Sequence, residues 1–251
     1  MTVVQLLVAY DGTRYAGWQR QPNTLTVQVV LEEALRRLDG RRVMTTAAGR
    51  TDAGVHAVGQ VVHASLRRPR SPTVLRRALN ALLPDDIVVR RVTPAPIGRH
   101  PRFDAARKWY RYRIATGPVR PLFDRAYVHY ISQPLNVAAM RRAARAWVGR
   151  HDFRAFHSAG RSVSSTRRRI YRLRVATSGR ATSGRVGELR IDVVADGFLY
   201  HMVRRMVGAL LQIGRGQWTP EMANALLTHR SGLVAPTAPA RGLCLMQVTY
   251  G

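Results

Sequence analysis

The sequence predicts an α+β fold made of two halves of similar plan, related by a pseudo-twofold axis, with a cleft between them. In each half, segments rich in β-branched residues alternate with segments whose apolar residues recur at helical spacing. Both halves read strand, helix, strand, strand, helix, strand. The proline-containing segment from Thr93 to Gly98 separates them, because proline hinders regular strand pairing. We expect an N-terminal half over residues 1–104 and a C-terminal half over residues 105–251.

The first half shows its elements through apolar periodicity and through residues typical of helix ends. Hydroxyl side chains precede both apolar helical stripes, and a glycine follows the first of them. The predicted elements are, in order, a strand from Val3 to Tyr10, a helix from Val27 capped by Thr26 and ended by Gly40, strands on both sides of residues 48–56, a helix opening at Ser71-Pro72, and a strand from Ile87 to Val92.

The second half repeats this order with a longer hairpin. A short tandem repeat from Thr177 to Arg185 predicts a hairpin tip between its paired strands. The predicted elements are a strand from Lys108 to Ile114, a helix over Val137, Met140, Ala144 and Trp147 ended by Gly149, paired strands from Tyr171 to Val175 and from Glu188 to Ala195, a helix from Phe198 to Ile213, and a last strand from Gly242 to Tyr250.

The charge of the chain is strongly one-sided. Its 251 residues carry 41 basic against 14 acidic side chains, for a formal net charge of +27, and 46% of the residues are hydrophobic. Lys108 is the only lysine, which leaves 40 arginines. Arginine offers a bidentate fork for phosphate and a plane that stacks on bases. The composition predicts a globular protein whose partner is a polyanion such as RNA.

Cysteine content and hydropathy indicate the cellular compartment in which the protein is expected. Cys244 is the single cysteine, which rules out a disulfide within the chain and suggests no cysteine-ligated zinc site. The first residues lack the basic flank and apolar run of a signal peptide, and no apolar stretch reaches membrane-spanning length. We therefore expect a cytoplasmic protein that does not enter the membrane.

One loop holds a carboxylate between two glycines, in the run from Ala48 to His56. Gly49 and Gly54 permit tightly bent backbone and the close approach of a ligand, and Arg50 stands two residues before Asp52. The residues alone favour an ordinary Asx turn for this pattern over a catalytic loop.

Several blocks in order resemble the bacterial tRNA pseudouridine synthases of the TruA family. The resemblance starts at the Asp52 loop, continues through Gln60 to His63, and extends over nearly the whole chain. It implies a mixed sheet with helices on one side and a central catalytic cleft. The other matching blocks are Tyr10 to Gln21, Lys108 to Tyr112, His201 to Gly208, and Gly242 to Leu245.

The resemblance implies an isomerase, an intramolecular transferase that converts uridine to pseudouridine at positions 38, 39 and 40 of the tRNA anticodon stem-loop, and a homodimer. Asp52 is then the nucleophile, attacking either C6 of the base or C1′ of the ribose. Arg204 matches the arginine that pairs with this aspartate, and Tyr110 matches the tyrosine that stacks on the target base. Because isomerisation exchanges no electrons or groups with the surroundings, we expect no cofactor and no metal.

Further residues are candidate substrate contacts. Arg50 is placed to occupy the space that the flipped base leaves. In the family the loop after the first strand helps to hold the RNA, which makes Arg14, Trp18, Gln19 and Arg20 candidates. His201 and Arg205 share the polar face of the helix from Phe198 with Arg204 and are RNA-facing or structural. His56 and His63 are expected to be hydrogen-bonded structural residues, since their spacing matches no recognised zinc arrangement.

Two other functions remain open from the sequence. A noncatalytic RNA-binding protein or RNA chaperone on the same scaffold would explain the charge equally well. A glycosidase would also use a carboxylate at an anomeric carbon, but its usual partner carboxylate is not evident. Asp52 together with Arg204 and Tyr110 favours the enzyme.

Overall fold

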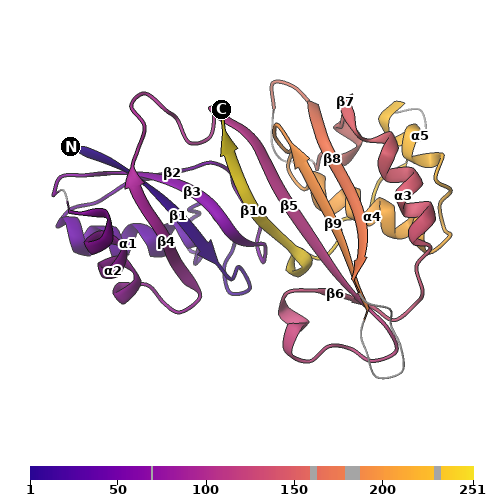
Figure 1. The fold of residues 1–251 in the computed structure, drawn as a ribbon, viewed down its shortest axis with the longest axis horizontal. Coiled ribbons are helices and arrows are strands. Elements are labelled where there is room, and N and C mark those ends of the chain that lie inside the picture. Colours follow the sequence, from indigo (N-terminus) through magenta and orange to yellow (C-terminus); the bar gives the residue numbers. More distant parts are fainter. Residues whose placement is uncertain (69, 159–162, 179–186, 229–232) are drawn as a thin grey trace. The chain divides into compact units, whose positions relative to one another are not determined.

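Ten strands and five helices form the α+β fold of the computed structural model, which describes residues 1–68, 70–158, 163–178, 187–228 and 233–251 (Figure 1). Strand pairing is mixed, because β3 with β10 and β5 with β6 run parallel, whereas β1 runs antiparallel to β3 and β4, and β9 runs antiparallel to β5 and β8. No helix within these residues is long and apolar enough to span a bilayer. The chain divides into two compact units, one of residues 1–106 with 244–251 and one of residues 107–243.

The first unit is a sheet in the order β4-β1-β3-β10, with the short β2 paired to β3. Helices α1 and α2 pack against each other, and α2 packs on β4. The elements are β1 (Thr2–Tyr10), α1 (Val27–Asp39), β2 (Thr45–Ala47), β3 (His56–Leu66), α2 (Pro72–Leu82), β4 (Ile87–Pro94) and, from the end of the chain, β10 (Leu243–Tyr250).

The helix ends in this unit confirm the capping residues expected from the sequence. Thr26 accepts a hydrogen bond from the amide of Val29, and Gly40 ends α1 in the left-handed conformation, at φ +75°. Ser71 accepts from the amide of Val74, and Pro72 follows it at the start of α2. These caps satisfy amides and carbonyls that the helices leave without internal partners.

The core of the first unit follows the alternation of β1. Every second side chain of β1 is buried, which identifies one face of the sheet as the core face. Apolar side chains of α1 and α2 are buried as well. The core includes Val4, Leu6, Val8 and Tyr10 of β1, Leu31 and Leu35 of α1, and Leu75 and Leu79 of α2.

The proline-containing segment from Thr93 to Gly98 departs from the expectation that it lacks strand pairing throughout. Thr93 and Pro94 continue the pairing with β1, opposite Gln5 and Val4. Proline is tolerated there because β4 is the edge strand of the described sheet, so no strand on its outer side needs the missing N–H. The irregular connection therefore begins at Ala95.

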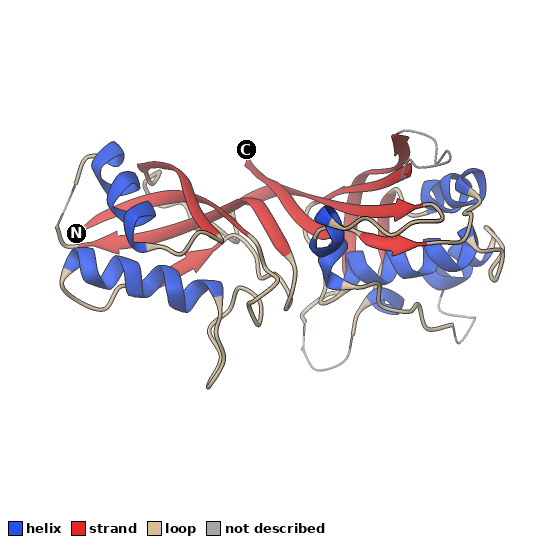
Figure 2. Cartoon of the chain, turned by 90° about the horizontal axis from the view of Figure 1, so that it is seen from below, coloured by secondary structure: helices blue, strands red, loops and turns tan. Residues whose placement is uncertain are grey.

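The second unit is a sheet in the order β5-β9-β8-β7, with β6 paired to β5. Helix α3 packs on β8 and against α4 and α5 (Figures 1 and 2). The elements are β5 (Ala105–Thr116), β6 (His129–Ile131), α3 (Val137–Ala146), β7 (Gly149–Asp152), β8 (Arg167–Ser178), β9 (Gly187–Ala195), α4 (Met202–Gly214) and α5 (Met222–Thr228), with one-turn 3₁₀ segments at Phe123–Ala126, Arg154–Phe156 and Ala240–Gly242.

Helix α4 begins four residues later than the apolar stripe predicts. His201, directly before it, has a left-handed φ of +62°, which a helix cannot include. β6, β7 and α5 are not predicted from the sequence, because they are too short to show a clear periodicity. Most of the predicted hairpin tip, residues 179–185, lies outside the described residues.

The last strand corrects the expected division into consecutive halves. β10 pairs with β3, with Cys244 opposite His56 and Leu245 opposite Ala57. The end of the chain therefore belongs to the unit that begins it. Apolar periodicity predicted the strand correctly, but periodicity does not identify the partner of a strand.

Candidate active site

Asp52 lies on the loop between β2 and β3, where the sequence predicted it. Gly54 has a left-handed φ of +74°, and the amide of Val55 donates to the carbonyl of Asp52 at 3.1 Å. Main-chain atoms thus close the turn. Asp52 is half-buried and Arg50 is exposed, so both are accessible to a ligand that approaches the loop.

The segment after β1 supports this loop through its backbone. The amide of Trp18 donates to the carbonyl of Thr51 at 3.1 Å, and the amide of Gly54 donates to the carbonyl of Tyr15 at 3.3 Å. Gly17 has a φ of +90°, and a Cβ at this position would lie 2.6 Å from the carbonyl oxygen of Thr51. Glycine is therefore required there by both conformation and space.

Side chains from the sheet reach the same loop from its buried side. The hydroxyl of Tyr10 lies 2.8 Å from Oγ1 of Thr51, and the amide nitrogen of Gln60 donates to the carbonyl of Gly49 at 2.8 Å. The ring centroids of Tyr10 and Trp18 are 5.9 Å apart. Burial raises the pKa of Tyr10, so its hydroxyl stays neutral at physiological pH.

The predicted RNA contacts on this segment differ in exposure. Arg14 is exposed, with Nη1 3.7 Å from Asp86, and Arg20 is exposed and pairs with the buried Glu32. Gln19 is half-buried. Trp18 is only 1% exposed, so its ring packs in the core of the unit, and the prediction that it contacts RNA is corrected to a role in supporting the loop.

The two histidines considered as metal ligands are hydrogen-bonded within the first unit, as expected. Nδ1 of His56 accepts from the amide of Gly12 at 3.0 Å, and Nε2 of His63 lies 3.2 Å from Oε1 of Gln5. Burial lowers the pKa of His63. Throughout the described ranges, no group of three or more His, Cys, Asp or Glu side chains is placed to hold a metal ion.

Tyr110 belongs to β5 in the second unit and is 7% exposed. Its ring meets Phe198 edge to face, with centroids 5.2 Å apart. Its side chain lies on the same face of β5 as the buried Tyr112, whose hydroxyl donates to the carbonyl of Pro239 at 2.8 Å. A ring fixed in this way can offer one face or edge to a base without loss of its own position.

Arg204 lies on α4 and is held by the segment before β10. Its Nε donates to the carbonyl of Ala238 at 2.8 Å, and the amide of Ala238 donates back to the carbonyl of Arg204 at 3.1 Å. A Cβ on Gly208, one turn further, would lie 1.8 Å from the carbonyl oxygen of Pro236. The side of α4 that bears Arg204 and Gly208 is therefore covered by protein.

His201 and Arg205 also have partners within the second unit. Nδ1 of His201 lies 2.9 Å from Oγ of Ser158, and its ring stacks on Tyr200 at 3.8 Å. Arg205 donates from Nη1 to the carbonyl of His157 at 3.1 Å. These contacts support the structural alternative for both residues, while contact with RNA stays a prediction. Asp52 lies in the first unit and Arg204 in the second, so their pairing also stays a prediction.

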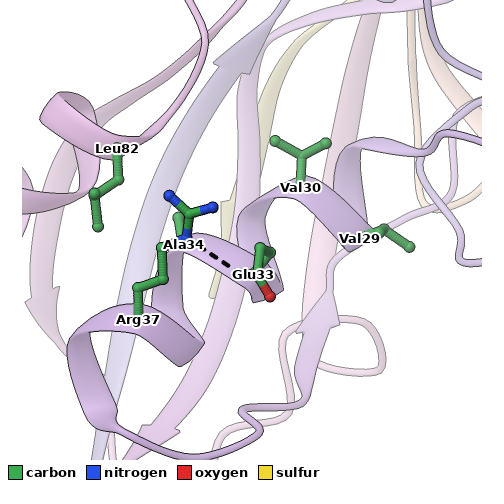
Figure 3. Close-up of a pocket in the computed structure, with 6 residues that line it drawn as sticks. All are labelled: Val29, Val30, Glu33, Ala34, Arg37 and Leu82. Atoms are coloured by element: carbon green, nitrogen blue, oxygen red, sulfur yellow. Dashed lines mark hydrogen bonds and ion pairs between the residues drawn. The ribbon is translucent and has the colours of Figure 1, made fainter.

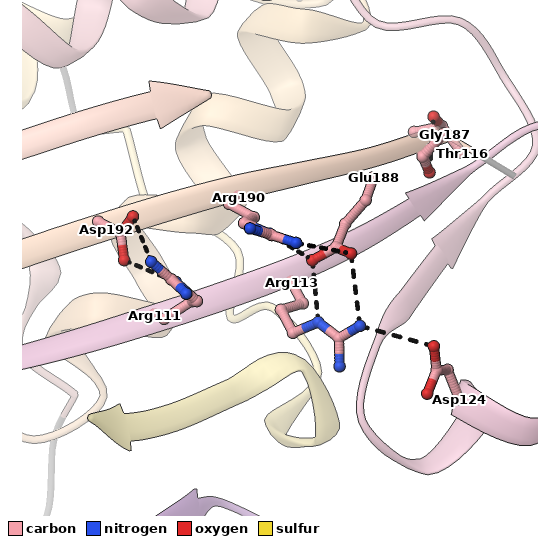
Figure 4. Close-up of polar contacts among 8 residues, drawn as sticks. All are labelled: Arg111, Arg113, Thr116, Asp124, Gly187, Glu188, Arg190 and Asp192. Carbon is pink, nitrogen blue, oxygen red and sulfur yellow. Dashed lines mark hydrogen bonds and ion pairs between the residues drawn. The ribbon is translucent and has the colours of Figure 1, made fainter. Parts of the chain in front are cut away.

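A row of ion pairs lies on one face of the second sheet (Figure 4). This is the other face from the one that bears Tyr110 and Tyr112. Nε of Arg111 donates to Asp192 at 2.9 Å, and Nε of Arg113 donates to Glu188 at 2.9 Å. Glu188 also accepts from Nε of Arg190 at 2.8 Å. These arginines are neutralised by neighbouring carboxylates and are weaker candidates for phosphate contacts than the exposed arginines are.

A pocket of the first unit lies between α1 and α2 (Figure 3). Glu33 and Arg37 pair beside it, with Nε of Arg37 3.2 Å from Oε1 of Glu33. The lining shares no residue with the predicted site and consists of Val29, Val30, Glu33, Ala34, Arg37 and Leu82.

Comparison with known proteins identifies the family. A family model described as tRNA pseudouridine synthase matches residues 6–104 and 143–251. The chain belongs to this family. It is 46% identical to tRNA pseudouridine synthase A of Moorella thermoacetica over the full length of both chains. It is 43% identical to the protein of the same name from Geobacillus kaustophilus, over 98% of this chain and 94% of that one.

Membership of the tRNA pseudouridine synthase family makes this chain an isomerase that acts on uridine in tRNA. The matched ranges include Asp52 and Arg204, whereas Tyr110 falls between them. The full-length relatives extend over that gap. The family resemblance of the sequence is thereby confirmed, and the roles of individual residues remain predictions.

Three residues that support the Asp52 loop from its buried side are not predicted as such from the sequence: Tyr10, Thr51 and Gln60. A signal for Tyr10 was present, because it ends β1 in phase with the buried residues Val4, Leu6 and Val8. A tyrosine in that position needs a partner for its hydroxyl. Nothing in the local sequence indicates that the partner is Thr51, 41 residues later.

Proposed function

We propose that the chain converts uridine to pseudouridine at positions 38, 39 and 40 of the tRNA anticodon stem-loop, as a homodimer in the cytoplasm. The observation that carries the chemical part of this proposal is the loop of Asp52. It presents a carboxylate next to an exposed arginine, on a backbone held by the segment after β1. Such support keeps a nucleophile oriented without help from the substrate.

The reaction conserves every atom of the nucleotide. The bond from C1′ to N1 breaks, the uracil rotates while it is held, C5 bonds to C1′, and the proton on C5 moves to the base nitrogen that was released. Asp52 is the proposed nucleophile, at either C6 of the base or C1′ of the ribose. Since no electrons or groups are exchanged with the surroundings, the residues of the chain suffice for this chemistry.

Other residues are assigned to orientation and to base flipping. Arg204 is assigned to pair with Asp52 and to orient its carboxylate. Tyr110 stacks on the target uracil, and its phenol is a candidate to move the C5 proton. Arg50 fills the space that the base leaves, which offsets part of the few kcal/mol that unstacking costs.

The remaining contacts proposed for tRNA are electrostatic. The net charge of +27 favours binding of a polyanion, and Arg14 and Arg20 are exposed on the segment next to the Asp52 loop. Gln19, His201 and Arg205 complete the proposed set of RNA contacts. A noncatalytic RNA chaperone would share these contacts, so the decisive test concerns chemistry.

Asp52→Asn tests the proposal. The amide has the shape of the carboxylate but is a poor nucleophile, so pseudouridine formation should fall at least about 1000-fold while tRNA affinity stays within about twofold. The measurement is mapping of pseudouridine in unmodified tRNA, with substrates in which cytidine replaces uridine 38, 39 or 40 in turn. Asp85→Asn, the same change at an exposed carboxylate of the first unit, is the control. Turnover by Asp52→Asn near that of the wild type would contradict the assignment.

A further inference from the structure

The buried side of the Asp52 loop contains a hydrogen bond that the reaction as described does not use. Tyr10 and Thr51 are 4% and 6% exposed, and their hydroxyl oxygens lie 2.8 Å apart. We infer that Tyr10 is a positioning residue for the reaction: through Thr51 it fixes the backbone from which the side chain of Asp52 projects. This inference rests on the proposed role of Asp52 as nucleophile.

Thr51 is held at both its side chain and its main chain. Oγ1 bonds to Tyr10, and the carbonyl oxygen accepts from the amide of Trp18 at 3.1 Å. The following residue is Asp52, whose carbonyl accepts from the amide of Val55. With residue 51 fixed at two points and the turn closed at residue 55, little freedom remains in the backbone of Asp52.

The backbone of Tyr10 is held by strand pairing on both sides. It is the last residue of β1 and pairs with Ala57 of β3 on one side and with Ile87 of β4 on the other. The register between β1 and β3 shifts between Val8 and Tyr10. Irregularities of this kind re-aim side chains next to active sites, and here the irregularity comes directly before the hydroxyl that reaches the loop.

The hydroxyl acts as a hydrogen-bonding group and not as an acid or base. Burial raises the pKa of Tyr10, and side-chain hydrogen bonds with Thr51 and Gln60 oppose that effect only in part. A buried hydroxyl that loses its partner is costly, so the pair holds a single arrangement. A displacement of about 1 Å at a reacting group can slow a reaction about 100-fold.

The test uses Tyr10→Phe, Thr51→Val and the double variant in the full-length protein. Each single change removes the bond at nearly constant shape. We expect single-turnover rates at saturating tRNA to fall about 10-fold to 100-fold, with tRNA affinity within about twofold of the wild type. Because both changes remove the same bond, the double variant should be no slower than the slower single variant.

Matched variants separate positioning from general destabilisation. Thr51→Ser keeps the hydroxyl and should recover most of the rate. Tyr250→Phe removes a tyrosine hydroxyl that donates to Pro101 at the same distance, 2.8 Å, elsewhere in the first unit, and should leave the rate unchanged. Thermal unfolding of every variant measures the folded fraction, to which each rate is scaled. If Tyr10→Phe does not fold, the comparison of Thr51→Val with Thr51→Ser decides alone.

Wild-type rates in Tyr10→Phe and Thr51→Val would overturn the inference and leave the role of Asp52 intact. A rate loss that saturating tRNA restores, or that Thr51→Ser shares with Thr51→Val, would also overturn it. Activity of Asp52→Asn, in contrast, would overturn the proposed function itself, so the two failures are distinguishable.

Discussion

Gly17 illustrates how single residues determine the geometry around Asp52. Its φ is left-handed, at +90°, and a Cβ at this position would lie only 2.6 Å from the carbonyl oxygen of Thr51, so a larger residue would require movement of the loop. Arg204 is held as closely, since its Nε and its carbonyl oxygen both bond to Ala238. At this scale the site depends on main-chain contacts as much as on charged side chains.

Arg204→Ala should slow the single-turnover reaction about 100-fold even at saturating tRNA, because Asp52 would lose its proposed partner. Replacing the exposed Arg67, Arg68 and Arg70 together by alanine should instead weaken tRNA binding and leave the saturated rate near that of the wild type. Rapid-quench assays over a range of tRNA concentrations distinguish the two. Full recovery of Arg204→Ala in excess tRNA would show that this arginine is a binding contact.

At the scale of elements, the second sheet joins β5 to β9 by cross-strand pairs. Arg111 lies opposite Asp192 in the register, and Nε1 of Trp109 donates to the same carboxylate at 2.7 Å. Glu188 accepts from both Arg113 and Arg190. Burial alone would raise the pKa of Glu188, but the hydrogen bonds from Arg190 and Arg113 lower it to about 2.

The lowered pKa of Glu188 predicts a pH-dependent stability. Its folded pKa is below its unfolded value of about 4.3, so the stabilisation is complete above that value and is lost as the pH falls toward 2. Glu188→Gln should lower the free energy of unfolding by about 1–2 kcal/mol at pH 7 and by progressively less from pH 5 to pH 2. Urea unfolding across this range measures the difference. A constant difference over the whole range would exclude ionisation as its origin.

At the scale of the whole molecule, the excess of arginine dominates. The net charge of +27 comes from residues spread along the entire chain. Some of these arginines are neutralised in ion pairs, as Arg111 and Arg113 are. We expect the exposed ones to supply the long-range attraction for a polyanion, independently of the chemistry proposed for Asp52.

Binding of tRNA should therefore depend steeply on salt. Each phosphate contact releases counterions, so the logarithm of the association constant should fall linearly with the logarithm of salt concentration, by about 0.7 to 0.9 per contact. Titrations between 50 and 200 mM salt measure the slope. The triple alanine variant at Arg67, Arg68 and Arg70 should have a shallower slope. An affinity that does not change with salt would contradict electrostatic binding.

Local sequence patterns predicted several helices and strands of this protein, and its family. Caps and apolar stripes located α1 and α2 correctly, and a β-branched run located β1. The ordered motifs indicated the family that comparison confirms. The positions of these elements could be predicted because capping, periodicity and turn formation depend on residues only a few positions apart.

Tertiary structure alone decided which distant segments meet. It paired β10 with β3, buried Trp18 under the Asp52 loop and joined Tyr10 to Thr51. These outcomes depend on which strand finds which partner and on how backbones pack at glycine positions, and neither is encoded within a short window. The sequence by itself determined the types of the longer elements, the position of the Asp52 loop and the charge, whereas long-range packing decided which side chains support that loop.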